Sequence, residues 1–495
     1  MSPRLPRVAG ALLAIALAFA AQASALSRGR IYVEDGFDGS QFKPGGQTIV
    51  GAGGDSIGRL RWKHWGSKRA VGHGTWYEGD GRTGRFPIVI ALTRPKWCKA
   101  NAVLPVSARF YQQRTIIFTH GVAHGWKRTE RTPMFCPEVL KAPPGIIDSD
   151  APADVPGLTS GVAQVSSGWV QACALTTDGA VECWGWNTYG GLGDRTRTTR
   201  RNPVRVQGLT EPTASVATGD QFACALSTTG AVSCWGDNRA GQLGDASKTS
   251  RAVAGPVSGL DSGVTAIAAG ADHACALLTD GTVKCWGSND SGQIGDGTTV
   301  LRAVPVAVSG LSGVTAIDAG TSYTCALTSG GGVKCWGYDK NGQLGNGSTR
   351  DAHTPVDVVG LQTGVSSVSA GAFHACALMS DGSVKCWGAN DDRELGDGTT
   401  RMRTAPVAVA GLAEPMTAMS AGDFHNCALG RSGRLWCWGD NFKGELGDGT
   451  EQERLGPVEV RDAAGVVSAV SPGGGFTCMV TTAGGAKCWG GLEYV

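Results

Sequence analysis

Fourteen of the sixteen cysteines in this 495-residue chain form seven pairs of identical spacing, and the pairs recur about every 51 residues. In each pair the second cysteine lies ten residues after the first and begins the tripeptide Cys-Trp-Gly. A fixed period of this length, carried by a unit too small to bury its own core, is typical of repeat architectures. We therefore expect an all-β fold, a closed seven-bladed β-propeller preceded by a small β-rich domain. The pairs are Cys173 with Cys183, Cys224 with Cys234, Cys275 with Cys285, Cys325 with Cys335, Cys376 with Cys386, Cys427 with Cys437, and Cys478 with Cys488.

The segment between the two cysteines of a pair has the pattern of a β-hairpin. In the first repeat two apolar runs flank Thr177-Asp178-Gly179, a three-residue loop with glycine where a positive φ is needed. Counting outward from this loop places Cys173 opposite Cys183, within reach of a disulfide. The same register places Trp184 opposite Ala172, on the other face of the sheet. Because both faces are then apolar, the hairpin belongs to a sheet that is covered on both sides.

Each repeat also contains two further strand-like runs, which gives the four strands of a propeller blade. In the third repeat these are Val264–Ala268 and a run around Pro256, and proline is tolerated in an outermost strand. Since the seventh repeat has no Pro-Val run after it, the segment at 154–158 is predicted to complete the last blade and close the ring.

The first 25 residues have the pattern of a secretory signal peptide. Two arginines precede the apolar run Ala11–Ala20, and Ala23-Ser24-Ala25 is a small-residue cleavage site. No later stretch reaches 18 apolar residues, so we expect no membrane span after cleavage. Export to an oxidising compartment favours disulfides over free thiols. The predicted location is outside the cytoplasm, either secreted or associated with the cell envelope.

Charge divides the remaining chain into two parts. Residues 27–150 carry 19 lysines and arginines against 10 acidic residues, whereas residues 151–495 carry 23 against 32. We predict a signal peptide at 1–25, a basic β-rich domain at 27–141, a linker at 142–152 and the propeller at 153–495. The basic domain is expected to contain a disulfide between Cys98 and Cys136 and strands near 31–33, 87–92, 103–106 and 115–119. An uneven but merely solvated surface is the alternative interpretation; an anionic envelope polymer is a candidate partner of the basic domain.

The repeat consensus Ala-Gly-x-x-His-x-Cys-Ala-Leu, followed by Asp-Gly-x-Val-Lys-Cys-Trp-Gly-x-Asn-x-x-Gly-Gln-Leu-Gly-Asp-Gly-Thr, resembles that of the regulator of chromosome condensation family. Examples run from Ala269 to Thr298 and from Ala370 to Thr399. The resemblance covers residues 151–495 and implies a seven-bladed propeller. In nuclear members it implies nucleotide exchange on a small GTPase and chromatin docking. The cysteine pairs and the signal peptide depart from those members and are closer to an exported bacterial branch that includes a β-lactamase-inhibiting propeller.

No motif for a catalytic nucleophile, a zinc protease or a phosphate-binding loop occurs in the chain, and no cofactor or nucleic-acid partner is expected. His120 and His124 are more consistent with solvated side chains than with a metal site. His273, His374 and His425 share one repeat position that also accepts phenylalanine, which indicates a structural role. The segment 289–296 faintly resembles a calcium loop, but it has too few acidic ligands and is better interpreted as a turn.

Two loop positions vary between repeats while the scaffold residues recur. One precedes the first cysteine and includes Asp220, Asp272 and Asp423; the other follows Cys-Trp-Gly. Aromatic side chains beside charges on a rigid rim suit a protein–protein contact, although ordinary loop variability is the alternative. The candidate partner-binding residues are Trp169, Trp186, Tyr189, Tyr338, Phe373, Phe424 and Phe442.

These observations predict a secreted, non-catalytic propeller that binds an extracellular protein, with inhibition of an enzyme as one form of that binding. The alternative is a structural or envelope-attached protein that is anchored by its basic domain. An enzyme and a guanine-nucleotide exchange factor are the remaining hypotheses. The sequence does not identify the partner.

Overall fold

The computed structural model describes residues 148–491 continuously and, before them, only the backbones of strands between residues 15 and 118. Two compact units are present, residues 1–144 and 145–495. In the first unit five antiparallel strands form a sheet in sequential order, and two short strands pair separately. The five are β3 (Ile49–Val50), β4 (Ser56–Lys63), β5 (Arg69–Tyr77), β6 (Arg85–Cys98) and β7 (Ala108–Phe118); the pair is β1 (Ile15–Ala16) with β2 (Glu34–Asp35).

Strand β6 includes the predicted run at 87–92, β7 includes residues 115–118 of the predicted run at 115–119, and the structure adds β4 and β5. The predicted runs at 31–33 and 103–106, His120, His124 and the pairing of Cys98 with Cys136 lie outside the described residues or concern side chains that are not described.

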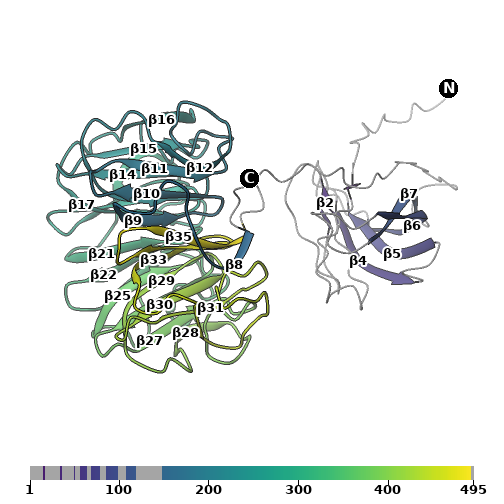
Figure 1. The fold of residues 1–495 in the computed structure, drawn as a ribbon. Coiled ribbons are helices and arrows are strands. Elements are labelled where there is room, and N and C mark those ends of the chain that lie inside the picture. The colour runs from purple at the N-terminus through teal and green to yellow at the C-terminus, as the bar shows by residue number, and fades with distance from the viewer. Residues whose placement is uncertain are drawn as a thin grey trace. The chain divides into compact units, whose positions relative to one another are not determined.

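The second unit is a ring of seven four-stranded antiparallel sheets, as the repeat period predicts (Figure 1). Seven inner strands neighbour one another around the ring. They are β9 (Val162–Ser167), β13 (Thr213–Thr218), β17 (Val264–Ala269), β21 (Val314–Ala319), β25 (Val365–Ala370), β29 (Met416–Ala421) and β33 (Val467–Pro472). The second strands are β10 (Gln171–Thr176), β14 (Phe222–Ser227), β18 (His273–Leu278), β22 (Tyr323–Thr328), β26 (His374–Met379), β30 (His425–Gly430) and β34 (Phe476–Thr481).

The third strands contain the Cys-Trp-Gly tripeptides, and the fourth strands form the outer edge. The third strands are β11 (Val181–Gly185), β15 (Val232–Gly236), β19 (Val283–Gly287), β23 (Val333–Gly337), β27 (Val384–Gly388), β31 (Leu435–Gly439) and β35 (Ala486–Gly491). The outer strands are β12 (Arg200–Arg205), β16 (Arg251–Pro256), β20 (Arg302–Ala307), β24 (Ala352–Asp357), β28 (Arg403–Ala408), β32 (Val458–Glu459) and β8 (Asp148–Asp154).

The predicted hairpin register is confirmed in every blade. Cys173 pairs with Cys183 and Ala172 with Trp184, and the other six blades repeat this register. Gly179 has the positive φ of 82° that the three-residue turn requires.

The seven predicted disulfides of the propeller are all formed, each within one blade. The two Cα atoms of each bond lie 4.0–4.1 Å apart, as directly opposed residues of neighbouring strands do. The bonds join Cys173 to Cys183, Cys224 to Cys234, Cys275 to Cys285, Cys325 to Cys335, Cys376 to Cys386, Cys427 to Cys437, and Cys478 to Cys488. No disulfide of the described region links one blade to the next, so the blades are held together by packing and hydrogen bonds.

The hydrophobic core lies between blades, since each sheet buries both of its faces. The face that carries the disulfide of Cys173 and Cys183, together with Leu175 and Val181, packs against Trp235 of the next blade. All seven Cys-Trp-Gly indoles are fully buried. The sheet covered on both sides that the hairpin pattern predicts is therefore observed, and no blade has a core of its own.

Strand β8 closes the ring. It pairs antiparallel with β35, with Ala153 opposite Cys488 and Asp154 opposite Lys487 (Figure 1). The predicted closure of the ring by the segment before the first repeat is confirmed. The paired strand is Asp148–Asp154, so it begins upstream of the predicted segment 154–158 and includes residues of the predicted linker 142–152. A short polar segment with a central proline carries little β signal, and its extended conformation comes from the unpaired edge of β35.

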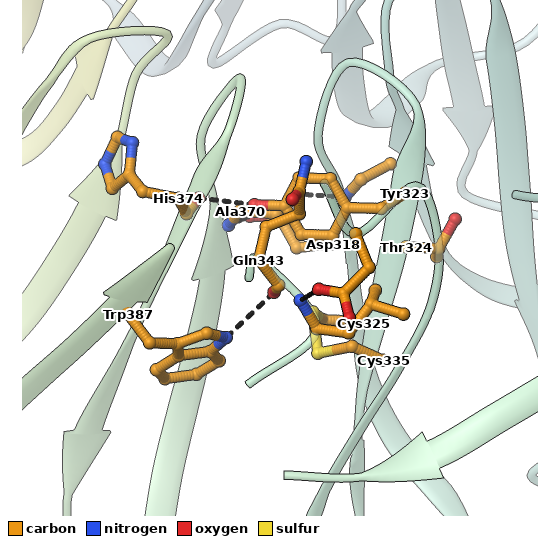
Figure 2. The surroundings of a disulfide bond; sticks show 12 residues. Asp318, Tyr323, Thr324, Cys325, Cys335, Gln343, Ala370, His374 and Trp387 are labelled. Carbon is orange, nitrogen blue, oxygen red and sulfur yellow. Dashed lines mark hydrogen bonds between the residues drawn. A yellow bond between two sulfur atoms is a disulfide. The ribbon is translucent and has the colours of Figure 1, made fainter. Parts of the chain in front are cut away.

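Hydrogen bonds tie successive blades together near the start of each second strand. Figure 2 shows the Trp387 indole donating to the Gln343 carbonyl of the preceding blade, at 2.8 Å, and the Tyr323 hydroxyl donating to the His374 carbonyl of the following blade. Equivalent indole bonds occur from Trp235, Trp286, Trp336, Trp438 and Trp489.

The three repeat-position histidines belong to this set of ties, which confirms a structural role. Each is fully buried, and its Nε2 contacts a polar side chain of the next blade. These contacts are His273 with Thr324 at 2.9 Å, His374 with Asn426 at 2.9 Å and His425 with Thr477 at 2.6 Å. Where the position is Phe222, Tyr323 or Phe476, the next blade instead supplies Ala274, Ala375 or Ala172 to the same core.

Candidate binding face

Both variable loop positions lie at one end of the ring, which we call the upper face. In each blade the inner strand leads to this end, the second strand leaves it and the third strand returns to it. A backbone hydrogen bond from Trp186 to Val170 joins the two loops in the first blade, and Tyr338 to Ser322 and Asp440 to Phe424 do so in others. Loops that are far apart in sequence therefore form one surface.

The aromatic candidates all lie on this upper face, with unequal exposure. Trp169 is 51% exposed and Phe442 is 37% exposed, which makes them the two large aromatic side chains of the described region that are most open to contact. The others are half-buried: Trp186, Tyr189, Tyr338, Phe373 and Phe424. The candidates come from the first, fourth, fifth and sixth blades, and none comes from the second, third or seventh.

Contacts between blades fix the orientation of several of these rings. Tyr338 meets Phe373 of the next blade edge to face, with ring centroids 6.4 Å apart. The Arg239 guanidinium lies 4.3 Å from the centre of the Tyr189 ring and forms an ion pair with the buried Asp237 at 2.8 Å. Side chains held in one conformation lose little entropy on binding, which favours them as contact residues.

A central cavity of about 360 Å³ lies along the inner strands, between the seven hairpins of the upper face. Its lining is rich in alanine, serine and glycine. Glycine is required because a side chain would clash with the backbone of the next blade. A Cβ atom on Gly219 would lie 2.4 Å from the Gly270 carbonyl oxygen, and a Cβ atom on Gly270 would lie 2.3 Å from the Gly320 carbonyl oxygen. Small residues therefore let the seven hairpins converge on the axis.

Carboxylates gather at the mouth of this cavity. Asp220 and Asp423 belong to its lining and are half-buried. Burial and the negative charges of Asp423 and Asp272 raise the pKa of Asp220 well above its ordinary value, and burial raises the pKa of Asp423 to about 6. Deeper, Asp318 accepts hydrogen bonds from Ser369 and from the Ala370 amide of the next blade, both at 2.9 Å. The centre of the upper face therefore carries carboxyl groups whose neutral form is favoured by burial.

Two buried glutamates support the loops between the fifth, sixth and seventh blades. Glu394 and Glu445 occupy the position held by glutamine in blades two to four, and they accept backbone hydrogen bonds from Asp392 and Lys443. Burial raises the pKa of each to about 8. A neutral carboxyl group has the shape and the acceptor of the glutamine it replaces.

Among the residues that the structure describes, no group of three or more His, Cys, Asp or Glu side chains is arranged to hold a metal ion. The segment 289–296 forms a turn in which Asn289 Nδ2 donates to the carbonyls of Thr298 and Val300. Within the same region, no helix has the length and apolar character needed to cross a bilayer.

Sequence reasoning identified the aromatic and aspartate loop positions but missed three features of the site. The central cavity, the inward position of Asp318 and the pairing of each histidine with the next blade depend on contacts between repeats. Asp318 carried a usable signal, since it is the only charged residue among the seven described inner strands.

The fold and the arrangement of its loops define a seven-bladed propeller that presents variable loops at one face. The sequence model of the RCC1-like domain matches residues 143–422 and 262–494. The chain belongs to this family.

This chain spans very different shares of the lengths of its curated relatives. The E3 ubiquitin-protein ligase HERC2 of Homo sapiens is 32% identical over 63% of this chain, which spans 6% of that protein. The ultraviolet-B receptor UVR8 of Arabidopsis thaliana is 28% identical over 56% of the chain, which spans 64% of the receptor. The mitochondrial RCC1 domain-containing protein RUG3 of the same plant is 29% identical over 72% of the chain and 69% of its own length.

Solved structures agree on the fold. Prp20p of Saccharomyces cerevisiae has a TM-score of 0.57 at 22% identity, over 67% of this chain and 82% of the yeast chain. Human WBSCR16 has a TM-score of 0.58 at 21% identity, over 70% and 95%. At this identity the likeness concerns the propeller alone.

Proposed function

We propose that this chain is a non-catalytic binding protein that acts outside the cytoplasm and holds a protein partner on the upper face of its propeller. The observation that carries the proposal is the set of seven aromatic side chains that share this face. Aromatic anchors on a rigid frame are the usual centres of protein–protein contacts. The seven disulfides support an oxidising environment, as expected for an exported protein.

The carboxyl groups at the mouth of the cavity indicate which side chains a partner would place there. A protein that donates hydrogen bonds from lysine or arginine side chains to Asp220 and Asp423, and places apolar surface over the aromatic rings of the same face, would complement the upper face. Inhibition of an extracellular enzyme is one form that such binding takes.

The proposal is tested in two steps. The full chain is first used to capture a partner from the native extracellular fraction, and single residues at one or the other end of the ring are then substituted. Trp169→Ala and Phe442→Ala remove the two most exposed aromatic anchors. We expect each to weaken binding at least tenfold, since anchor residues contribute about 2 kcal/mol or more. The control is Val466→Ala, which removes exposed apolar surface in the loop before β33, at the opposite end of the ring.

Loss of binding in Val466→Ala but not in the aromatic variants would place the contact elsewhere and refute the proposal. Isothermal titration calorimetry gives the affinity of each variant, and unchanged thermal unfolding excludes misfolding as the cause.

A second candidate rests on the charge of the first unit. Residues 27–150 carry 19 basic against 10 acidic residues, which suits attachment to an anionic envelope polymer. Salt-dependent retention of the full chain on isolated cell walls, abolished by removal of residues 27–144, would support an anchoring role in addition to binding.

A further inference from the structure

A buried asparagine organises the loop that follows the third strand in five of the six blades for which this loop is described. In the fifth blade, Asn390 Oδ1 accepts a hydrogen bond from the Leu395 amide at 3.0 Å. Its Nδ2 donates to the carbonyl oxygens of Thr399 and Arg401, both at 3.1 Å, and to Asp397 Oδ1 at 3.2 Å. The amide group therefore holds both halves of the loop together. The equivalents are Asn187, Asn238, Asn289 and Asn441.

The fourth blade exchanges the two polar residues of this motif. Asp339 stands in place of the asparagine, and Asn346 stands in place of the aspartate. The loop is otherwise built as in the fifth blade: Asp339 Oδ1 accepts from the Leu344 amide at 2.9 Å, and Asn346 Oδ1 accepts from the Ser348 amide at 2.9 Å. The Oδ2 atom of Asp339 consequently occupies the place of the amide nitrogen.

This oxygen is buried without a partner. Asp339 is fully buried, and its Oδ2 has no hydrogen bond. In the sister blades the atom at this place donates to backbone carbonyl oxygens, and a carboxylate has no hydrogen to donate. A protonated carboxyl group does have one, and it matches the amide in size and shape. An ionised oxygen that is buried without a hydrogen-bond partner is strongly unfavourable.

The charges around Asp339 do not compensate for its burial. Lys340 is paired with Asp351 at 3.0 Å, and Asp351 Oδ1 also accepts from the Asp339 amide at 3.0 Å. The position of the arginine that balances the aspartate in the fifth blade is taken by Ala352. The neighbouring strand β28 meets the loop through Thr404, and its Arg403 is held by Asp397. Burial, with a smaller contribution from Asp351, raises the pKa of Asp339 to about 7, against the lowering effects of the Leu344 amide, Lys340 and the Arg350 amide.

We propose that Asp339 is a proton-controlled lock on loop 338–351. With its proton, the side chain donates into the loop as asparagine does in the sister blades and keeps the loop closed. Without its proton, the buried charge drives the loop open. The loop begins with Tyr338, which packs against Phe373 on the upper face, and continues with the exposed Lys340. This consequence rests on the proposed function: binding to the part of the upper face formed by loop 338–351 should be stronger at mildly acidic pH than at alkaline pH.

The test is hydrogen exchange of the full chain without any partner, at about pH 6 and about pH 8. Loop 389–402 of the fifth blade, which has Asn390, serves as the internal reference for the intrinsic pH effect. We expect protection of loop 338–351 relative to loop 389–402 to fall about tenfold, since one pH unit above the pKa leaves about a tenth of the acid protonated. In Asp339→Asn the ratio should stay constant.

A reciprocal variant keeps the proposal falsifiable if Asp339→Asn fails to fold. Asn390→Asp places the same acid in the reference loop and should transfer the pH dependence to it. An unchanged ratio in the native chain, or a persisting fall in Asp339→Asn, would overturn the lock. Recovery of protection at pH 8 on addition of millimolar calcium chloride would also overturn it, because a metal cation would then occupy the site.

Because exchange is read without a partner, failure of the lock and failure of upper-face binding are distinguishable. If a captured partner is available, its affinity for the native chain should weaken from pH 6 to pH 8, and its affinity for Asp339→Asn should not.

Discussion

Single side chains form hydrogen bonds across the interfaces between neighbouring blades, which we call seams. These bonds require that the residues on the two sides of a seam match. His273, His374 and His425 each find a hydroxyl or amide in the next blade, whereas Phe222 and Phe476 meet alanine. A buried polar atom without its partner costs about 1–3 kcal/mol, whereas an apolar pair that replaces both partners is nearly neutral. The two residues on either side of a seam are therefore matched to each other.

This matching predicts non-additive substitutions at the seam between the third and fourth blades. Thr324→Ala removes the partner of His273 and should destabilise the protein by about 1–3 kcal/mol. Adding His273→Phe recreates the combination already present at Phe222 and Ala274, and should recover most of that loss. Denaturant unfolding of both single variants and the double variant gives the coupling; simple additivity would show that the residues are not paired.

The buried histidines also make stability depend on pH. Burial lowers the pKa of His273 and His374 to about 4 and that of His425 to about 3. The folded state keeps these rings neutral, whereas the unfolded chain binds protons below about pH 6.5. Above pH 6.5 both states are neutral and titration of the histidines does not affect stability. As the pH falls from 6.5 toward 4, each histidine lowers the free energy of unfolding by about 1.4 kcal/mol per pH unit.

Glu394 and Glu445 act in the opposite direction, since their raised pKa values favour the folded state as the pH falls below about 8. A comparison of variants isolates the histidine effect from this background. Relative to the native chain, the double variant with His273→Phe and Thr324→Ala should gain about 2 kcal/mol between pH 7 and pH 5. An unfolding free-energy difference that does not change with pH would show that His273 titrates normally in the fold.

At the scale of strands and turns, the Cys-Trp-Gly glycine shows how the sequence specifies a blade. Gly337 has a φ of 111°, and a Cβ there would lie 2.6 Å from the Ser322 carbonyl oxygen and 2.7 Å from the Tyr323 Cα. The third strand must turn away at this point against the backbone of the second strand. Only glycine meets both the conformational and the steric demand.

Two glycine substitutions separate these demands. Gly310→Ala acts at a positive φ of 67° in open space, so it should cost only about 1 kcal/mol of backbone strain. Gly337→Ala adds the clash and should cost about 2 kcal/mol more, within the range of overpacking in a filled site. Equal melting temperatures for the two variants would contradict the close approach.

Much of the element structure could be predicted because it depends on local spacing. The ten-residue cysteine interval and the Thr177-Asp178-Gly179 turn determine the hairpin register between them. Strand β8 could be anticipated only as a missing edge, since nothing in Asp148–Asp154 indicates a strand. The exchange of Asp339 and Asn346 was visible in the sequence, but its meaning depends on a loop whose two halves meet through one amide.

At the scale of the molecule, the first and last blades are joined by a strand from outside the repeats. Beyond the β8–β35 ladder, the Val155 amide donates to the Ala486 carbonyl and the Ala486 amide donates to the Leu158 carbonyl. This edge pairing joins the N-terminal end of the propeller to its last hairpin. A ring without it would expose the backbone of β35.

Two truncations test this closure. Removal of residues 1–144 keeps β8 and should leave propeller unfolding cooperative, whereas removal of residues 1–158 should lower the melting temperature and produce oligomers through the free β35 edge. Calorimetry and size-exclusion chromatography report both effects. A monomeric, equally stable 159–495 fragment would show that β8 is dispensable.

The proposed binding face depends on the whole ring, because the ring brings together loops about 51 residues apart. The most direct test is a hydrogen-exchange footprint of the full chain with its captured partner. We predict slower exchange in upper-face segments such as 168–170, 186–191, 338–342 and 440–444, and no change in the turns at the opposite end, such as 177–180 and 460–466. Protection confined to the opposite turns, or to residues 27–144, would contradict binding through the upper face.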